Sequence, residues 1–138
     1  VELAPGPFAV AGLEAHAVPI RHTAQSLGYR LVGDTGSIAF SGDADECDEL
    51  VELARDVDLF VCEAATPDGQ KLDGHLTPRL TAGYAQRARA RQLLLTHFYP
   101  ECDGHDLRPA AAEVYDGPVE LAQDLATHTI APGPAAEG

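Results

Sequence analysis

The stretch SIAFSGD, at residues 37–43, combines an apolar strand with a polar exit. Its first part, Ser37–Phe40, is short and mostly apolar, which is typical of a strand in a buried sheet. A glycine and the carboxylate of Asp43 follow almost directly. In layered α/β proteins, sites form where strands end, because the sheet holds the loop residues there rigidly together. The stretch therefore predicts a strand that delivers Asp43 to the edge of a sheet.

On the N-terminal side of this stretch, the sequence predicts further strands. Phe8–Val10 and Leu13–Ile20 are short and apolar, and apolar residues alternate at the start of the second. Gly28–Val32 and Ser37–Phe40 flank a Gly-Asp-Thr-Gly turn at residues 33–36, whose residues tolerate positive φ angles. These two strands are expected to form a hairpin.

On the C-terminal side, helix-like and strand-like segments alternate. Asp45–Arg55 has apolar residues at helical spacing and acidic residues at its start, where the helix dipole favours them. Thr77–Ala90 begins with residues that suit the cap and the first turn of a helix. The remaining expected elements are strands at Asp58–Ala64 and Gln92–Thr96, a short helix at Arg108–Tyr115, and final strands at Pro118–Leu121 and Thr127–Ile130. This order predicts an α/β or α+β layered fold, with a mixed sheet flanked by helices.

Length and composition predict one domain with an acidic surface. The chain has 138 residues, 45% of them hydrophobic and 22% charged, so residues 1–130 fit a single domain and the Pro-, Gly- and Ala-rich residues 131–138 a flexible tail. A net charge of −13 disfavours a broad contact with nucleic acid, which requires a basic face. No apolar run reaches the ~20 residues of a membrane span, and an odd set of three cysteines indicates reduced thiols in a cytoplasmic protein. Because the chain begins at Val1 and contains no methionine, we expect a processed product, an excised fragment or the ordered part of something longer.

Three polar side chains at predicted strand ends suggest a metal site. Asp43, His97 and His22 each follow an apolar strand, and Asp and His are ligand types for zinc and other divalent transition metals. Structural roles are the alternative for all three. Asp43 could instead cap the helix predicted from Asp45, and a histidine at a strand end commonly bonds a backbone carbonyl.

Several short motifs follow one another along the middle of the chain. His22 precedes a Gly-Tyr-Arg strand, residues 28–30, by a short interval, and Ser41-Gly42-Asp43 follows it. The later motifs are DLFVCEA at Asp58–Ala64, GHLT at Gly74–Thr77 before a helix, and LLTHF at Leu94–Phe98 where a strand ends. In their order and intervals, these motifs resemble the ribonuclease Z-like branch of the metallo-β-lactamase superfamily.

The resemblance implies an αββα sandwich with two divalent metals at one edge, zinc in the first place and manganese as the alternative. It implies that His22 binds one metal, Asp43 bridges both and His97 binds the second. His75 would face the scissile phosphate, where it neutralises charge or protonates the leaving oxygen. Glu63, at the end of a buried strand, would orient a ligand. A helix cap or an exposed position is the alternative for His75, and a plain salt bridge is the alternative for Glu63.

One part of the family pattern is missing. The His-x-His-x-Asp-His motif, which supplies the other ligands in the family, does not occur in this sequence. The chain therefore resembles the C-terminal half of the fold, and we expect it to be inactive alone. A lone half exposes the sheet face that normally packs on its twin, which favours a homo-oligomer or a missing N-terminal half.

The function that the resemblance implies is metal-dependent hydrolysis of a phosphodiester, or of an ester, by metal-activated water. Because only residues 31–40 separate the Gly-Tyr-Arg strand from Ser-Gly-Asp, and the chain is acidic, a small substrate is favoured over transfer RNA. Since half of the ligands are missing, an inactive remnant that serves as a binding or assembly module is the alternative. A third hypothesis is a metal-free α/β response-type domain in which Asp43 lines an acidic pocket.

Overall fold

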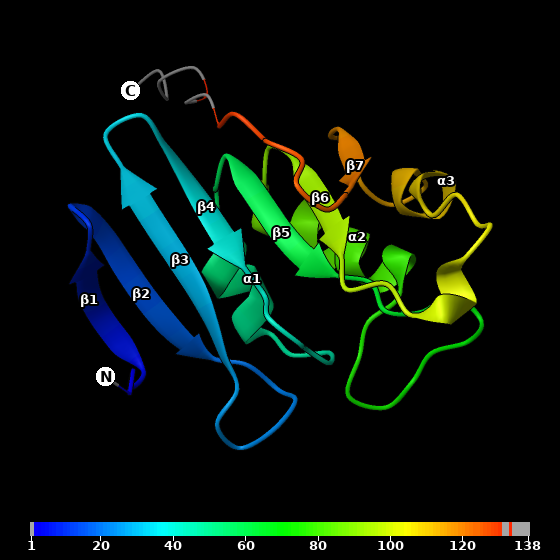
Figure 1. The fold of residues 1–138 in the computed structure, drawn as a ribbon, viewed down its shortest axis with the longest axis horizontal. Helices are drawn as coiled ribbons and strands as arrows, with labels where there is room; N and C mark the ends of the chain where they lie inside the picture. The colour runs from blue at the N-terminus through cyan, green and yellow to red at the C-terminus, as the bar shows by residue number, and fades with distance from the viewer. Residues whose placement is uncertain (1, 131–132, 134–138) are drawn as a thin grey trace.

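The computed structural model describes residues 2–130 and Gly133, and shows one mixed sheet with its helices packed on one face (Figure 1). Seven strands follow one another across the sheet in chain order. They are β1 (Gly6–Val10), β2 (Leu13–Pro19), β3 (Leu27–Gly33), β4 (Gly36–Phe40), β5 (Leu59–Glu63), β6 (Leu93–Thr96) and β7 (Val119–Leu121). The helices are α1 (Glu49–Ala54), α2 (Pro78–Ala88) and α3 (Arg108–Ala112), with a 3-10 turn, η1, at Pro100–Cys102. This is the layered α/β fold with a mixed sheet that the sequence predicts.

The first four strands form an antiparallel meander, and the predicted hairpin at residues 33–36 joins β3 to β4. Gly28 in β3 allows α1 to approach closely, because a Cβ atom there would lie 2.6 Å from Leu53 Cδ2 and 2.9 Å from Ile20 Cγ1. Arg30 points to the same side, where its guanidinium donates to the carbonyls of Leu53 and Arg55. Since side chains alternate along a strand, the odd-numbered residues of β3 face away from α1.

The strands β4 to β7 are parallel, and the helices lie in the connections between them. The core beneath these helices contains fully buried side chains such as Leu50, Phe60 and Leu95. Because parallel strands end at the same edge of a sheet, the residues that follow β4, β5 and β6 are brought together. The predicted site residues Asp43 and His97 lie just beyond this edge.

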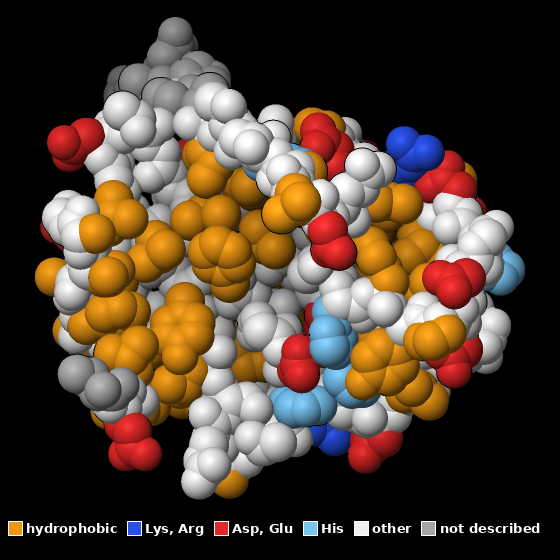
Figure 2. Space-filling view, in the orientation of Figure 1, with side chains coloured by type: hydrophobic (Ala, Val, Ile, Leu, Met, Phe, Trp, Pro, Cys, Tyr) orange, Lys and Arg blue, Asp and Glu red, His pale blue; other side chains and the backbone are white. Residues whose placement is uncertain are grey.

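The opposite face of the sheet is apolar, and none of the described helices covers it (Figures 1 and 2). Tyr29 and Leu31 of β3 face this side, in register with Phe40 and Ile38 of β4. The ring of Phe8 in β1 extends the apolar surface and meets Tyr29 edge-on, with centroids 6.3 Å apart. We call this surface the open face. One layer of helices on one sheet is half of an αββα sandwich.

Three local predictions need correction. The helix predicted from Asp45 begins only at Glu49, because the Asp45 carboxylate ties residues 45–48 into a loop through bonds to other segments. α3 ends at Ala112, and Tyr115, predicted as its last residue, turns inward to donate its hydroxyl to a backbone carbonyl. Thr127–Ile130 is not a strand, because the chain turns back after β7 and Ile130 packs against Gly36 at the start of β4.

The C-terminal tail predicted at residues 131–138 lies outside the described residues except for Gly133. Within the described part of the chain, no helix has the length and apolar character needed to cross a membrane.

Candidate metal centre

The predicted ligands come from three loops at one end of the sheet. Asp43 follows β4, His97 follows β6, and His22 lies in the connection between β2 and β3. His97 has a φ angle of 64°, a left-handed conformation that is costly for a residue with a side chain. Such backbone strain is concentrated at functional sites, where the surrounding structure holds it in place.

Asp43 stands between the two predicted histidine ligands. Its Oδ1 atom lies 3.5 Å from Nε2 of His97, and its Oδ2 atom lies 3.9 Å from Nε2 of His22. The Asp43 side chain is 48% exposed, so the carboxylate faces solvent between the two imidazoles. The structure therefore brings His22, Asp43 and His97 together, with a different carboxylate oxygen toward each histidine.

The protonation of His22 follows from its second nitrogen. Nδ1 lies 2.7 Å from the carbonyl oxygen of Gly74, which can only accept a hydrogen bond, so Nδ1 carries the proton. In the neutral ring, Nε2 then carries a lone pair, and this atom faces the carboxylate of Asp43. A histidine that donates its outer N–H to a carbonyl is the usual arrangement for a metal ligand, because that bond fixes both the tautomer and the ring orientation.

The Nε2 atom of His97 is buried, and it has no hydrogen-bond partner within the described part of the chain. A buried polar atom without a partner costs free energy, and its closest charged neighbour is Asp43 at 3.5 Å. This removes the alternative in which Nε2 bonds a backbone carbonyl. The alternative in which Asp43 caps a helix is also removed, since the residue before α1 is Asp48. This donor set fits divalent cations, because imidazole nitrogens and carboxylate oxygens are the ligands that such metals take.

His75 is buried beside this group and uses both of its nitrogens. Nδ1 lies 2.9 Å from Oε1 of Glu63, and Nε2 lies 3.0 Å from the hydroxyl of Tyr99. Because a carboxylate only accepts, Nδ1 carries the proton, and in the neutral ring Nε2 accepts from Tyr99. The structure thus removes the exposed position as an alternative for His75, which is only 9% exposed.

Glu63 is completely buried at the end of β5 and has several donors around it. Oε1 accepts from His75 and from the amide of Ala44 at 2.7 Å, and Oε2 accepts from the amide of Leu76 at 2.8 Å. The imidazole that Glu63 orients is therefore that of His75. The same carboxylate also fixes the loop after Asp43 against the start of α2.

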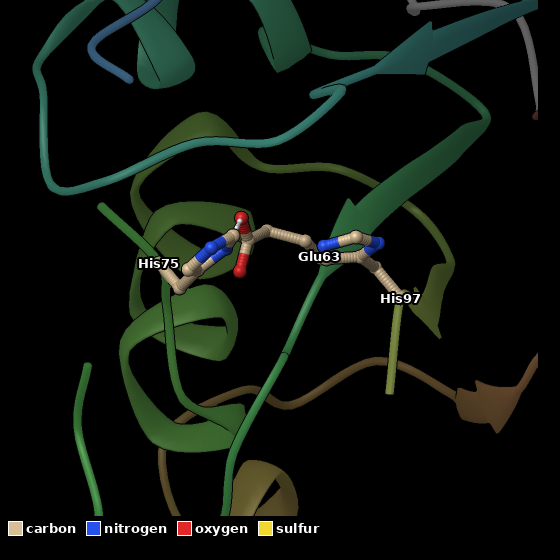
Figure 3. A group of neighbouring side chains, drawn as sticks. All are labelled: Glu63, His75 and His97. Carbon is tan, nitrogen blue, oxygen red and sulfur yellow. Dashed lines mark hydrogen bonds and ion pairs between the residues drawn. The ribbon is translucent and has the colours of Figure 1, made fainter. Parts of the chain in front are cut away.

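A second grouping of ligand atoms exists at this edge. Glu63, His75 and His97 each offer one ligand atom, and these atoms lie within 4.8 Å of one another (Figure 3). Figure 3 shows the Glu63 carboxylate turned toward His75. A cation could bind here only if His75 gave up one of its two hydrogen bonds, to Glu63 or to Tyr99. The grouping around Asp43 requires no such loss, so His22, Asp43 and His97 form the candidate metal centre.

Asp45 was not expected among the site residues, and it connects several of their loops. Its Oδ1 atom accepts from Nζ of Lys71 at 2.7 Å, and its Oδ2 atom accepts from the amide of Gly74 at 2.8 Å. Burial by itself would raise the pKa of Asp45, but hydrogen bonds from Lys71, Glu46 and Gly74 lower it to about 2. The only hint in the sequence is a second carboxylate two residues after Asp43.

A shallow cavity of about 350 Å³ opens beside Asp43 and His97. Its lining includes Phe40 and Val61, neighbours in β4 and β5, as well as Thr96 at the end of β6. Phe40 faces the open side of the sheet, so the cavity continues that surface at the edge where the metal centre lies. The cavity therefore leaves room beside the metal centre for a small molecule or for a further part of the protein.

The model of a protein family described as the beta-lactamase superfamily domain matches residues 1–98. The chain belongs to the metallo-β-lactamase superfamily. An uncharacterized protein of Mycobacterium tuberculosis, Rv1339, is 42% identical over 103 residues, which cover 72% of this chain and 38% of that protein. Ribonuclease Z of Myxococcus xanthus is 39% identical over 93 residues, which cover 63% of this chain and 30% of the enzyme. This superfamily chain thus spans well under half the length of these relatives.

Among solved structures, the metallo-β-lactamase fold protein YhfI of Bacillus subtilis is similar with a TM-score of 0.82 and 22% identity. The similarity covers 88% of this chain and 52% of YhfI. The expected membership in the superfamily is confirmed, and ribonuclease Z proteins are among the relatives. The expected partial fold is confirmed too, because the match takes in nearly all of this chain but only about half of YhfI.

Proposed function

We propose that this chain carries the C-terminal part of the active site of a metal-dependent phosphodiesterase. In this proposal His22 holds one divalent cation, His97 holds a second, and Asp43 bridges the two, with zinc the favoured metal and manganese the alternative. The observation that carries it is the arrangement of Asp43, whose two oxygens face the Nε2 atoms of two different histidines.

His22 and Asp43 face each other with atoms that both accept hydrogen bonds. The Nε2 atom of His22 is an acceptor when the ring is neutral, because Nδ1 donates to Gly74, and it faces a carboxylate oxygen that is also an acceptor. Two acceptors stabilise each other only through a cation or a proton between them. A divalent cation, when bound, supplies a Lewis acid for the phosphoryl oxygen and lowers the pKa of a water to near neutrality.

His75 supports the same chemistry without being a ligand. Glu63 accepts the Nδ1 proton of His75, and this bond fixes the orientation of the ring. We infer that, when a phosphodiester binds, Nε2 leaves the Tyr99 hydroxyl and takes up a proton from water, and that the ring then donates this proton from Nε2 to the leaving oxygen and returns to its neutral form. Before a substrate binds, the hydrogen bonds of His75 to Glu63 and Tyr99 keep the ring oriented.

The substrate we propose is a small phosphodiester, with an ester as the alternative. The cavity beside Asp43 has about 350 Å³, which is within the range of small-molecule sites. A net charge of −13 opposes a long polyanion such as RNA, which is bound mainly through neutralised phosphates.

The site needs ligands from elsewhere. Three ligands are fewer than two cations require, and the chain spans 38% of Rv1339. We infer that the remaining ligands come from an N-terminal part that packs on the open face, either in the same longer protein or in a partner chain, with a second copy of this chain as the other candidate for that face.

Metal binding by the 138-residue chain tests this proposal directly. Calorimetry should show weak zinc binding, and Asp43→Asn should weaken it further, whereas Asp34→Asn in the exposed turn before β4 should not. Adding the N-terminal half in trans should raise the affinity and produce hydrolysis of bis(p-nitrophenyl) phosphate. Tight binding of two zinc ions by this chain alone, or zinc binding that survives Asp43→Asn unchanged, would contradict the proposal. Binding without hydrolysis in the completed protein would favour an inactive module.

A further inference from the structure

Asp45 is bonded on both of its carboxylate oxygens. Lys71 Nζ and the amide of Glu46 donate to Oδ1 at 2.7 and 2.8 Å, and the amide of Gly74 donates to Oδ2 at 2.8 Å. The Asp45 side chain is only 5% exposed, whereas that of Asp43, two residues earlier, is 48% exposed. Of two neighbouring carboxylates, one therefore faces the metal centre and the other is enclosed by donors.

These bonds converge on the residue that orients His22. Gly74 donates its amide to Asp45 and accepts the Nδ1 proton of His22 on its carbonyl, at 2.7 Å. The amide of Asp45 in turn donates to the carbonyl of Arg21, the residue before His22, at 2.6 Å. Asp45 thus contacts the chain on both sides of the imidazole.

The position of Gly74 leaves little freedom in this arrangement. Its φ angle is +85°, and a Cβ atom there would lie 3.3 Å from Nδ1 of His22. A glycine both permits the backbone conformation and lets the carbonyl approach the ring. Residues 69–73, which precede it, are exposed and form no helix or strand, so the bond from Asp45 restrains Gly74 on this side, while Glu63 holds His75 and Leu76 on the other.

We infer that Asp45 is a positioning residue that fixes the tautomer and orientation of His22 through Gly74 and so prepares Nε2 for a metal. Its role in metal binding rests on the proposed function, whereas its effect on the His22 ring does not. Lys71 completes the arrangement, because its ammonium balances the Asp45 charge and keeps that carboxylate from competing as a ligand.

The variant Asp45→Asn tests the inference in the full 138-residue chain. An asparagine has one side-chain oxygen, so its amide nitrogen must face either the Gly74 amide or Lys71, both of which are donors. The variant therefore loses at least one of these hydrogen bonds, while the volume of the side chain stays nearly the same. Long-range ¹H–¹⁵N NMR should show the Nδ1–H tautomer of His22 in the parent chain and a mixture of tautomers in Asp45→Asn. The Gly74 amide should exchange with solvent about tenfold faster, as expected for the loss of one hydrogen bond to a charged group.

Zinc affinity supplies the second arm of the test. Loss of a group that orients a ligand typically costs about 10–100-fold in metal affinity, and we expect a loss in that range for Asp45→Asn. Glu46→Gln is the matched control, since it removes the same charge from the next residue, whose side chain is exposed. It should leave the His22 tautomer and the affinity unchanged.

The outcomes separate this inference from the proposed function. If Asp45→Asn leaves the His22 tautomer and the Gly74 amide exchange as in the parent chain, and Asp45→Ala, which removes both oxygens, does so too, the inference is wrong, whatever the zinc data show. If both change but the parent chain binds no zinc, the positioning role stands and the proposed function fails. If neither variant folds, the parent chain decides: a His22 ring without a dominant Nδ1–H tautomer, or a Gly74 amide that exchanges as fast as the amides of the exposed residues 71–73, would overturn the inference.

Discussion

At the scale of single residues, neighbouring carboxylates have different roles because they have different numbers of donors. Glu63 and Asp45 are buried and accept several hydrogen bonds each, so they hold loops in place. Asp43 is half exposed, and its nearest polar partners are two imidazoles at 3.5 and 3.9 Å. The carboxylate with the fewest donors is the one suited to a cation.

The two histidines at 75 and 97 should therefore respond differently to truncation in the completed enzyme. His75→Ala should leave the zinc content unchanged and lower the rate by about 10²–10⁴-fold, the range for a positioned general acid. His97→Ala should lose zinc as well as rate, because its Nε2 atom has no other partner in the described part of the chain. Metal analysis and turnover on the same samples decide this. Loss of zinc from His75→Ala would show that the grouping of Glu63, His75 and His97 is the metal site.

At the scale of elements, the parallel strands β4, β5 and β6 must stay aligned for their exits to meet. Asp58, just before β5, contributes to this alignment by accepting from the amide and the hydroxyl of Ser37 in β4, at 2.8 and 2.9 Å. Burial acts to raise the pKa of Asp58, but hydrogen bonds from the amides of Gly133 and Ser37 and from the Ser37 hydroxyl, with the nearby charge of Arg91, lower it overall. The charged carboxylate therefore joins the two strands.

This contact predicts a pH-dependent stability. Because the folded pKa of Asp58 lies below its unfolded value, its contribution is present above the unfolded pKa and is lost as the pH falls toward the folded one. Asp58→Asn should cost about 1–3 kcal/mol at pH 7, as expected for hydrogen bonds to a charged group, and less at pH 3. Urea unfolding at both pH values measures the difference. Ser37→Ala removes the hydroxyl that donates to the Asp58 carboxylate and accepts from the Asp58 amide, but it leaves the charged carboxylate, so it should show a smaller difference between the two pH values. An equal cost for Asp58→Asn at both pH values would contradict this account.

At the scale of the whole molecule, a single layer of helices leaves one face of the sheet apolar. The open face includes Phe8, Tyr29, Leu31 and Ile38, and Figure 2 shows hydrophobic side chains gathered over β1 to β4. Large exposed apolar patches mark interaction surfaces or cause aggregation. The candidate metal centre lies at the edge of this same surface, so a partner that covers the face would also border the site.

We therefore expect the isolated chain to associate through the open face. Sedimentation velocity should show larger species as the concentration rises, and Leu31→Lys should shift the distribution toward the monomer by placing a charge on that face. Val32→Lys is the matched control, because the adjacent residue of β3 faces the side of α1. Equal effects of the two variants would show that association does not use the open face.

Local patterns in the sequence are enough to predict most of the fold and to nominate His22, Asp43 and His97, which the structure brings together. The strand before Asp43, the strand before His97 and the helix after Thr77 each follow from a few adjacent residues, and the tertiary structure has them where expected. The order of the motifs also indicates the family. These features are predictable because hydrophobic period, caps and turns depend on neighbours in the chain.

The remaining features depend on residues that are distant in sequence. Asp45 belongs to a loop instead of a helix because Lys71 and Gly74 donate to it across 26 and 29 positions. The tautomer of His22 is set by Gly74, 52 residues away, and His75 is enclosed by Glu63 and Tyr99 from two different strand exits. A pattern along the chain cannot specify which donor meets which acceptor, because those distances are set only when the sheet and its helices pack together. The sequence by itself determined the residue types at the site, and only the tertiary structure decided which of them are saturated by hydrogen bonds and which remain available to a metal.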